Sequence, residues 1–275
     1  MIKTLKSKLT LPRLPATIER ERLFSLLESI PSRKITTLVA GAGYGKTTLA
    51  TQIVTLLGYN YLWYRLDQSD IDFFTFLSYL IDGFRKHYPE FGHDTFKRIQ
   101  QTRSLKQEWR SVLITFLSEV DRCVDDDFII VIDDYHLIQE NPEINELTGF
   151  ILERLNPLLH LIIISRTDPK IALSKYRATR ELTEITEDDL RFTASEIKLI
   201  FKQLFNLSLE EQSLEILTEK TGGWVSGLIL FYHTMKGKNP KEIRRLLDHS
   251  KGTNKIIASY MEENFSLKLW ISRKI

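Results

Sequence analysis

The sequence has little cysteine, no long apolar run and no marked excess of charge of either sign. Its 275 residues include a single cysteine, Cys123, which excludes an internal disulfide and is typical of a reducing cytosol. No apolar run approaches the ~18 residues of a membrane-spanning helix, and the basic N-terminus lacks the apolar core of a signal peptide. The net charge of +2 creates no global field toward nucleic acid or membrane. These absences predict a soluble, cytoplasmic chain without membrane contact.

Apolar, β-branched segments alternate with helical patterns over the first two thirds of the chain. They are KITTLVA (34–40), YNYLWYRL (59–66), FIIVI (128–132), LIII (161–164) and LTEIT (182–186). The third and fourth are apolar throughout, as expected of strands covered on both faces. Between them, 105–124 has helical periodicity, and Asn141-Pro142 is a typical helix start. This alternation indicates crossover connections and a parallel sheet.

Strand signals stop after residue 190. Thr193-x-x-Glu196 and Ser208-x-x-Glu211 are each expected to form a capping box that opens a helix. Two further helices are expected after TGGW (221–224) and from Asn239-Pro240. The region is therefore predicted to be a small all-α domain.

The N-terminal residues divide into two predicted segments. Residues 1–16 are basic and contain Pro12 and Pro15, which favours an extended arm. Residues 17–30 have helical periodicity, with an apolar stripe made of Leu23, Leu26, Leu27 and Ile30. The predicted domains are thus the arm and helix (1–30), a sheet domain (31–190), a helical domain (191–250) and a tail or start of a further segment (251–275).

Residues 40–47, AGAGYGKT, match the phosphate-loop (Walker A) pattern G-x-x-x-x-G-K-[ST] except for alanine at the first position. Gly43 and Gly45 allow backbone N–H groups to point inward as an anion nest. Lys46 would reach the β- and γ-phosphates, and the Thr47 hydroxyl would hold Mg²⁺. The position between a strand and a helix favours this interpretation over a glycine-rich turn without ligand. The predicted phosphate-binding residues are Gly41, Ala42, Gly43, Tyr44, Gly45, Lys46, Thr47 and Thr48.

Two carboxylates end the buried strand in FIIVIDDYH (128–136). Buried charge is costly unless a metal or catalysis accounts for it, so Asp133 is predicted to join Thr47 as a Mg²⁺ partner (Walker B). Asp134 is the candidate that polarises an attacking water. A solvated Asp-Asp turn is the alternative for this segment alone. Together with the phosphate loop, the carboxylates predict a Mg-nucleotide site.

A third apolar strand ends in Ser165-Arg166, within LIIISRTDP (161–169). If this strand lies between the phosphate-loop strand and the acidic strand, its end points at the γ-phosphate. Arg166 would then distinguish a triphosphate from a diphosphate or stabilise transition-state charge. The spacing is equally compatible with a surface arginine. The candidate catalytic residues are therefore Lys46, Asp134 and Arg166.

Seven spaced blocks resemble a known family in the same order. They are KLTLPRLPATIERERL (8–23), AGYGKTTL (42–49), YLWYRLDQSD (61–70), VIDDYHLI (131–138), SRTDP (165–169), ELTEITEDDLRFTASE (181–196) and TGGWVSGLIL (221–230). The chain resembles the nucleotide-binding module of MalT-like regulators, large ATP-dependent members of the LuxR family in the STAND class of signal-transduction ATPases. The fold expected is α/β, a P-loop NTPase with a parallel sheet in the order 5-1-4-3-2, followed by a small all-α domain.

The resemblance implies an ATP/ADP switch that hydrolyses ATP slowly with Mg²⁺. Arg20 is the implied base contact, unless it is a surface charge on an amphipathic helix. TGGW stands where relatives have a Gly-x-Pro turn that touches the adenine; without the proline, an adenine contact from Gly223 or Trp224 is open, and Trp224 is equally compatible with core. Relatives continue into a winged helix, a repeat sensor and a DNA-binding helix-turn-helix. Tyr260, Glu262 and Glu263 still resemble the start of the winged helix, but LKLWISRKI (267–275) does not continue that pattern recognisably. This sequence contains no DNA-reading helix, so no direct DNA contact is expected from it.

Three functions are compatible with these features. The first is the switch, which binds adenine nucleotide and acts through self-association in the ATP state or through another regulatory protein. The second is a P-loop enzyme such as a small-molecule kinase or a motor ATPase, although no arginine-rich lid follows the phosphate loop. The third is a nucleotide-binding remnant without output. The sequence favours the switch.

Overall fold

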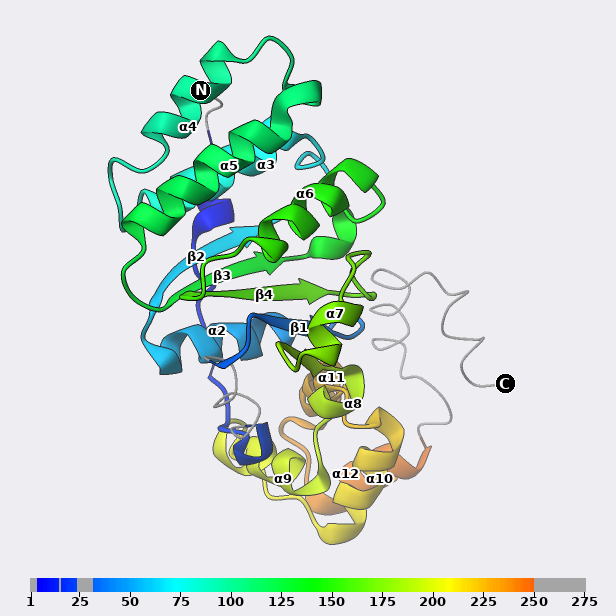
Figure 1. Ribbon diagram of the computed structural model, residues 1–275. Helices are drawn as coiled ribbons and strands as arrows, with labels where there is room; N and C mark the ends of the chain where they lie inside the picture. The colour runs from blue at the N-terminus through cyan, green and yellow to red at the C-terminus, as the bar shows by residue number, and fades with distance from the viewer. Residues whose placement is uncertain (1–3, 15, 24–31, 250–275) are drawn as a thin grey trace. The chain divides into compact units, whose positions relative to one another are not determined.

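The computed structural model describes residues 4–14, 16–23 and 32–249, which form two compact units (Figure 1). The first unit, the sheet unit, takes in the described parts of 1–13, 23–39 and 46–186. The second, the helical unit, takes in those of 14–22, 40–45 and 187–275. The phosphate loop is thus divided along the chain: residues 40–45 count with the helical unit, and Lys46 opens a helix of the sheet unit.

The sheet unit contains five parallel strands. They are β1 (Ile35–Val39), β2 (Asn60–Arg65), β3 (Phe128–Asp133), β4 (Leu159–Ser165) and β5 (Leu182–Ile185). Their order is β2-β3-β4-β1-β5, which reads 5-1-4-3-2 from the β5 edge, as expected. Every residue of β3 and β4 is buried, because both faces of these strands are covered. The register pairs Val39 with Ser165 and Arg65 with Asp133, so the ends of four strands share one edge.

Helices cover this sheet. Figure 1 shows α3, α5 and α6 on one side of it, with α2 on the other. The helices are α2 (Lys46–Leu57), α3 (Phe73–Phe84), α4 (His93–Gln101), α5 (Leu105–Cys123), α6 (Pro142–Glu153) and α7 (Ser174–Ala178). Asn141 caps α6 by accepting from the Glu143 N–H, as its Asn-Pro start predicts.

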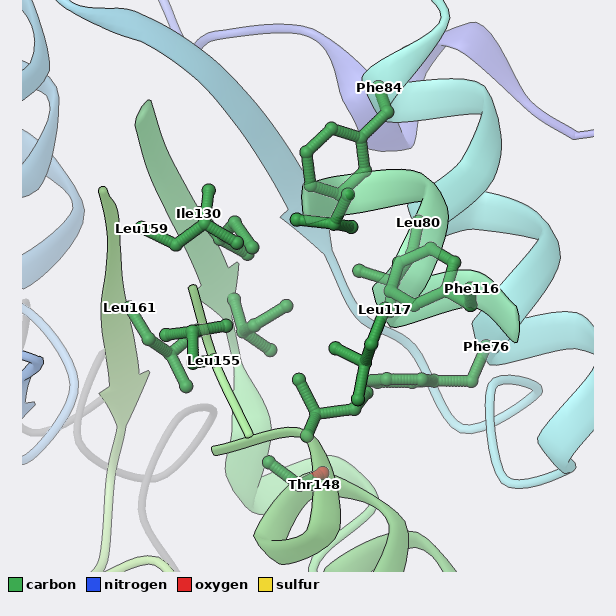
Figure 2. Close-up of a pocket in the computed structure, with 13 residues that line it drawn as sticks. Phe76, Leu80, Phe84, Phe116, Leu117, Ile130, Thr148, Leu155, Leu159 and Leu161 are labelled. Carbon is green, nitrogen blue, oxygen red and sulfur yellow. The ribbon is translucent and has the colours of Figure 1, made fainter. Parts of the chain in front are cut away.

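A small cavity of about 20 Å³ lies in the core between the sheet and its helices (Figure 2). Its lining is apolar except for Thr148. The Thr148 hydroxyl donates to the Ile144 carbonyl at 2.8 Å, so it offers no donor to a guest. A void of this size and polarity is a packing defect rather than a binding site.

The N-terminal segment corrects two predictions. Residues Lys6–Leu9 form a 3₁₀ helix, η1, rather than an extended arm. Leu9 is buried in the core of the sheet unit, and the Lys8 ammonium binds the buried Asp70 carboxylate at 2.8 and 2.7 Å. These contacts override the proline-based expectation. The predicted helix 17–30 is wrong over 17–20, which is not helical because Ile18 packs in the core of the helical unit and Arg20 binds Glu196 there. Residues 21–23 are helical and Leu23 is buried, whereas Leu26, Leu27 and Ile30 lie outside the described residues.

The described part of the helical unit is all-α around its own core. Its helices are α8 (Glu187–Leu190), α9 (Ala194–Gln203), α10 (Glu211–Thr221), α11 (Val225–Met235) and α12 (Pro240–His249). The capping box of Thr193 and Glu196 is confirmed. The box predicted at Ser208 is wrong, because Glu210 is the extended N-cap of α10. Leu207 and Leu209 pack against the core and hold that segment as a loop. Among the described residues, no helix has the length and apolarity to cross a membrane.

Candidate phosphate-binding site

The sheet unit places Thr47 against Asp133. Thr47 lies in the first turn of α2, and Asp133 is the last residue of β3. The Thr47 hydroxyl oxygen is 3.4 and 3.3 Å from the two carboxylate oxygens of Asp133. A hydroxyl beside a carboxylate is an oxygen donor set suited to Mg²⁺, which takes one or two protein oxygens and completes its shell with water and phosphate. The two residues predicted to bind the metal are therefore together.

Asp133 is poorly compensated for a buried carboxylate. It is 2% exposed, and burial raises its pKa to about 6, helped by the neighbouring charge of Asp134. The Arg65 charge and the hydrogen bonds from Thr47 and the Asp134 N–H lower the pKa only in part. A cation at this carboxylate would supply the missing compensation, because an opposite charge favours the ionised form. The electrostatics thus fit a metal ligand.

Asp134 turns the chain sharply after β3. Its backbone is left-handed, with φ 63° and ψ 36°, which is uncommon for a residue other than glycine. Its N–H donates to Asp133 Oδ1 at 3.0 Å, and its own Oδ2 lies 3.4 Å from Nε of Arg65. The turn therefore separates the two carboxylates: one is buried beside Thr47, and the other is half-buried toward Arg65.

His136 is a residue at this edge that the sequence analysis did not single out. It lies in the 3₁₀ turn η3 (Tyr135–Leu137), and its Nδ1 is buried without a hydrogen-bond partner in the described structure. Burial lowers its pKa, as do the charges of Arg166 and Lys46, while Asp134 opposes them. The imidazole is thus within electrostatic range of all three predicted catalytic residues. The signal available in the sequence was a histidine two residues after the acidic pair that ends the strand.

Arg166 follows the buried strand β4 and is exposed. The strand ends in the buried Ser165, whose hydroxyl accepts from the Thr167 N–H at 3.4 Å. Gln139 donates to the Thr167 hydroxyl at 2.7 Å and holds the turn in place. Because β4 lies between β1 and β3, this turn stands where the strand order was expected to put it.

Within the helical unit, loop residues 40–45 contact Glu187 and Arg191. Gly43 and Gly45 have φ of 75° and 82°, which glycine adopts without strain. The Gly41 N–H donates to Glu187 at 3.4 Å, and the Tyr44 ring lies 5.8 Å from the Arg191 guanidinium. The other predicted members are Ala42, which is buried here, and Lys46 and Thr48, which are buried and half-buried in α2 of the sheet unit.

Arg20 occupies a different setting from the predicted base contact. It is buried in the helical unit, where Nε donates to Glu196 at 3.0 Å. Its other nitrogens donate to the carbonyls of Leu190 and Arg191 at 3.0 and 2.8 Å. The guanidinium also lies 3.9 Å from the Phe192 ring centroid. These contacts account for a structural role, and an adenine contact stays a prediction.

Comparison with known proteins adds to this geometry. No protein-family model matches the chain. HTH-type transcriptional regulator MalT of Vibrio campbellii is 32% identical over 227 residues, which are 82% of this chain and 24% of that protein. The curated homologues of the present chain are MalT regulators. MalT of Cronobacter sakazakii is likewise 32% identical, over 228 residues. The chain spans about a quarter of the length of the MalT proteins it matches.

Solved structures bear on the fold of this MalT homologue. A Walker-type ATPase of Pyrococcus abyssi superposes with a TM-score of 0.52, at 16% identity, covering 89% of this chain and 75% of that one. At this identity the match concerns the fold alone. It agrees with the five-stranded parallel sheet of the described residues, and the fold is that of a P-loop NTPase.

Proposed function

We propose that this chain is the adenine-nucleotide-binding switch module of a MalT-like regulator. The observation that carries the proposal is the pairing of the Thr47 hydroxyl with the buried, incompletely compensated Asp133 carboxylate beside the phosphate-loop sequence. A P-loop fold and MalT homologues support it. Nucleotide is the ligand that would occupy such a loop together with a divalent cation.

Each site residue takes a role that its position allows. The backbone N–H groups of Gly41 to Thr48 would hold the phosphates, and Lys46 would neutralise them. Thr47 and Asp133 would hold Mg²⁺, which supplies charge neutralisation on the phosphate oxygens when bound. Asp134 would orient an attacking water, and Arg166 would inspect the γ-phosphate.

Slow hydrolysis is the expected behaviour of this arrangement. The Asp134 Oδ2 atom lies 3.4 Å from Nε of Arg65, so this carboxylate would share its hydrogen bonds between the arginine and an attacking water. ATP and ADP would differ in affinity for two states of the module, since a nucleotide shifts an equilibrium only through such a difference. Output would come through self-association in the ATP state or through another regulatory protein. A small-molecule kinase or motor ATPase is the alternative, and the MalT homologues favour the regulator.

A titration with a matched control tests this function. Calorimetry with ATP and ADP, each with Mg²⁺, is expected to show binding of both nucleotides by the wild-type protein. Lys46→Ala should weaken ATP binding by about 10- to 100-fold, because a charge-assisted contact to phosphate is lost. Lys170→Ala removes an exposed lysine paired with Glu140 and should leave the affinity unchanged.

Turnover and molar mass separate the alternatives. Phosphate release far below the roughly 1–100 s⁻¹ of kinases is expected. Equal affinities for ATP and ADP with an unchanged molar mass would remove the support for a switch. Rapid turnover with a phosphorylated acceptor would favour the enzyme.

A further inference from the structure

The start of α11 binds two carbonyl groups of the phosphate loop, within the helical unit. The Trp224 indole N–H donates to the Ala42 carbonyl at 3.0 Å. The Gly43 carbonyl accepts from both the backbone N–H and the hydroxyl of Ser226, at 3.2 and 3.1 Å. Both acceptors belong to the residues that the phosphate-loop pattern assigns to anion binding, and both donors follow the TGG sequence at 221–223.

Because a peptide group is planar, fixing the direction of a carbonyl also fixes the direction of the N–H of the next residue. The described chain has no cis peptide bond, and in a trans peptide the C=O and the following N–H point in opposite directions. Binding the Ala42 carbonyl therefore directs the Gly43 N–H away from α11. Binding the Gly43 carbonyl directs the Tyr44 N–H away in the same manner. The two amides are held by their carbonyl ends, and their N–H ends face the opposite side.

Gly43 is required for this approach. A Cβ at Gly43 would lie 2.3 Å from the Ser226 hydroxyl oxygen and 2.9 Å from the Trp224 indole nitrogen. Its φ of 75° disfavours other residues independently. The second glycine of the loop therefore serves contact with α11 as well as the turn itself.

Trp224 is itself held in place. It is 5% exposed and packs in the core of the helical unit. The preceding Gly223 accepts from the Phe192 N–H at 2.9 Å, and a Cβ there would lie 2.4 Å from the Phe192 carbonyl oxygen. On the other side, a Cβ at Gly227 would lie 2.7 Å from the indole ring. The indole therefore has little freedom to leave the Ala42 carbonyl.

We propose that Trp224 and Ser226 are positioning residues for phosphate recognition: they hold the loop carbonyls so that the Gly43 and Tyr44 N–H groups are preset toward the phosphate side. The proposal rests on the proposed function and assigns the TGGW segment to the phosphates instead of the adenine. The preset N–H groups lower the ordering cost of anion binding.

Trp224→Phe tests the role, because it keeps an aromatic ring and removes the indole donor. The probes are Mg-ATP and inorganic tripolyphosphate, with affinities measured by calorimetry. Both affinities should fall by the same factor, about fivefold, as expected for one lost hydrogen bond. Ser226→Ala should give a smaller fall, because its backbone N–H still binds the Gly43 carbonyl. Trp109→Phe, in the sheet unit, is the matched control and should change neither affinity.

A fall for ATP with unchanged tripolyphosphate binding would overturn the proposal and place Trp224 at the adenine. A second measurement does not depend on nucleotide binding. In amide-resolved NMR of the free protein, Trp224→Phe and Ser226→Ala should shift the Gly43 and Tyr44 amide signals, and Trp109→Phe should not. Unmoved signals would overturn the positioning role. If the wild-type protein binds neither probe, but the two variants still shift the Gly43 and Tyr44 amide signals, the proposed function alone would be overturned.

Discussion

Two buried carboxylates, one in each unit, are held in opposite ways. Glu196 in the helical unit is 7% exposed and binds Nε of Arg20 at 3.0 Å and Nε of Arg22 at 3.1 Å. It also accepts from the Thr193 N–H at 2.9 Å. Asp133 in the sheet unit is 2% exposed and accepts hydrogen bonds from the Thr47 hydroxyl and the Asp134 N–H. Similar burial therefore comes with very different compensation.

The two pKa shifts express this difference. Burial raises the pKa of Glu196, but the Arg20 and Thr193 hydrogen bonds and the charges of Arg20 and Arg22 outweigh it, so the net pKa is lowered. At Asp133 burial prevails, and the pKa rises to about 6. A carboxylate satisfied by its own chain stabilises the fold, whereas one left short of donors is available for an external cation. The number of compensating donors and cations thus distinguishes the structural acid from the candidate ligand.

Glu196→Ala should have the largest effect on stability. It leaves the Arg20 guanidinium buried without its carboxylate, and breaking such a pair costs about 3–5 kcal/mol. The free energy of unfolding in urea measures the loss. Glu219→Ala, an exposed glutamate in the same unit, is the control and should change it by less than about 0.5 kcal/mol. A loss near 0.5 kcal/mol for Glu196→Ala would mean that the cluster contributes little.

Asp133→Asn should stabilise the nucleotide-free protein at neutral pH. The raised pKa means that the folded state binds more protons than the unfolded state between pH 3.8 and about 6, so this residue's contribution falls as pH rises through that window. Asparagine removes the penalty, and the gain is up to ~3 kcal/mol above pH 6 and near zero at pH 4. Urea unfolding at several pH values measures it. A variant that is less stable than wild type at every pH would contradict the explanation.

The contribution of Glu196 to stability depends on pH in the opposite direction to that of Asp133. Its lowered pKa gives stability that is present above its ordinary value of 4.5 and is lost as pH falls. The deficit of Glu196→Ala should therefore shrink in acid, while the gain of Asp133→Asn shrinks there too. If lowering the pH changed the stability of both variants, relative to wild type, in the same direction, the contrast between the two sites would be lost.

Arg65→Ala should have the smallest effect. The Arg65 side chain is 66% exposed, so its ion pair with Asp134 is worth about 0.5 kcal/mol or less. Loss of its charge should still raise the pKa of Asp133 further, because that charge lowers it now. A carboxyl NMR titration of Asp133 detects the change. Arg177→Ala, whose partner is Glu184, is the control, and an equal rise there would discount a direct effect of Arg65.

Much of the fold could be predicted because it depends on local chemistry. The apolar runs at 128 and 161 became fully buried strands, and Asn141 and Thr193 capped the helices they precede. The capping box predicted at Ser208 is absent, because the packing of its neighbours Leu207 and Leu209 prevailed over a local capping signal. The extended conformation predicted for the N-terminal arm was wrong at Lys6–Leu9 for a similar reason, since a buried ion pair between Lys8 and Asp70 holds this segment as a 3₁₀ helix.

The sequence by itself determined the phosphate-loop pattern, the acidic strand end and the alternation that leads to a parallel sheet, because each depends on neighbouring residues and their spacing. Only the tertiary structure decided how the side chains are compensated. Trp224 meets a carbonyl 182 positions away, and Arg20 meets a glutamate 176 positions away. No spacing rule reaches such separations. The pKa of Asp133 is likewise a property of its burial and of the few donors around it, and it exists only once the chain has folded.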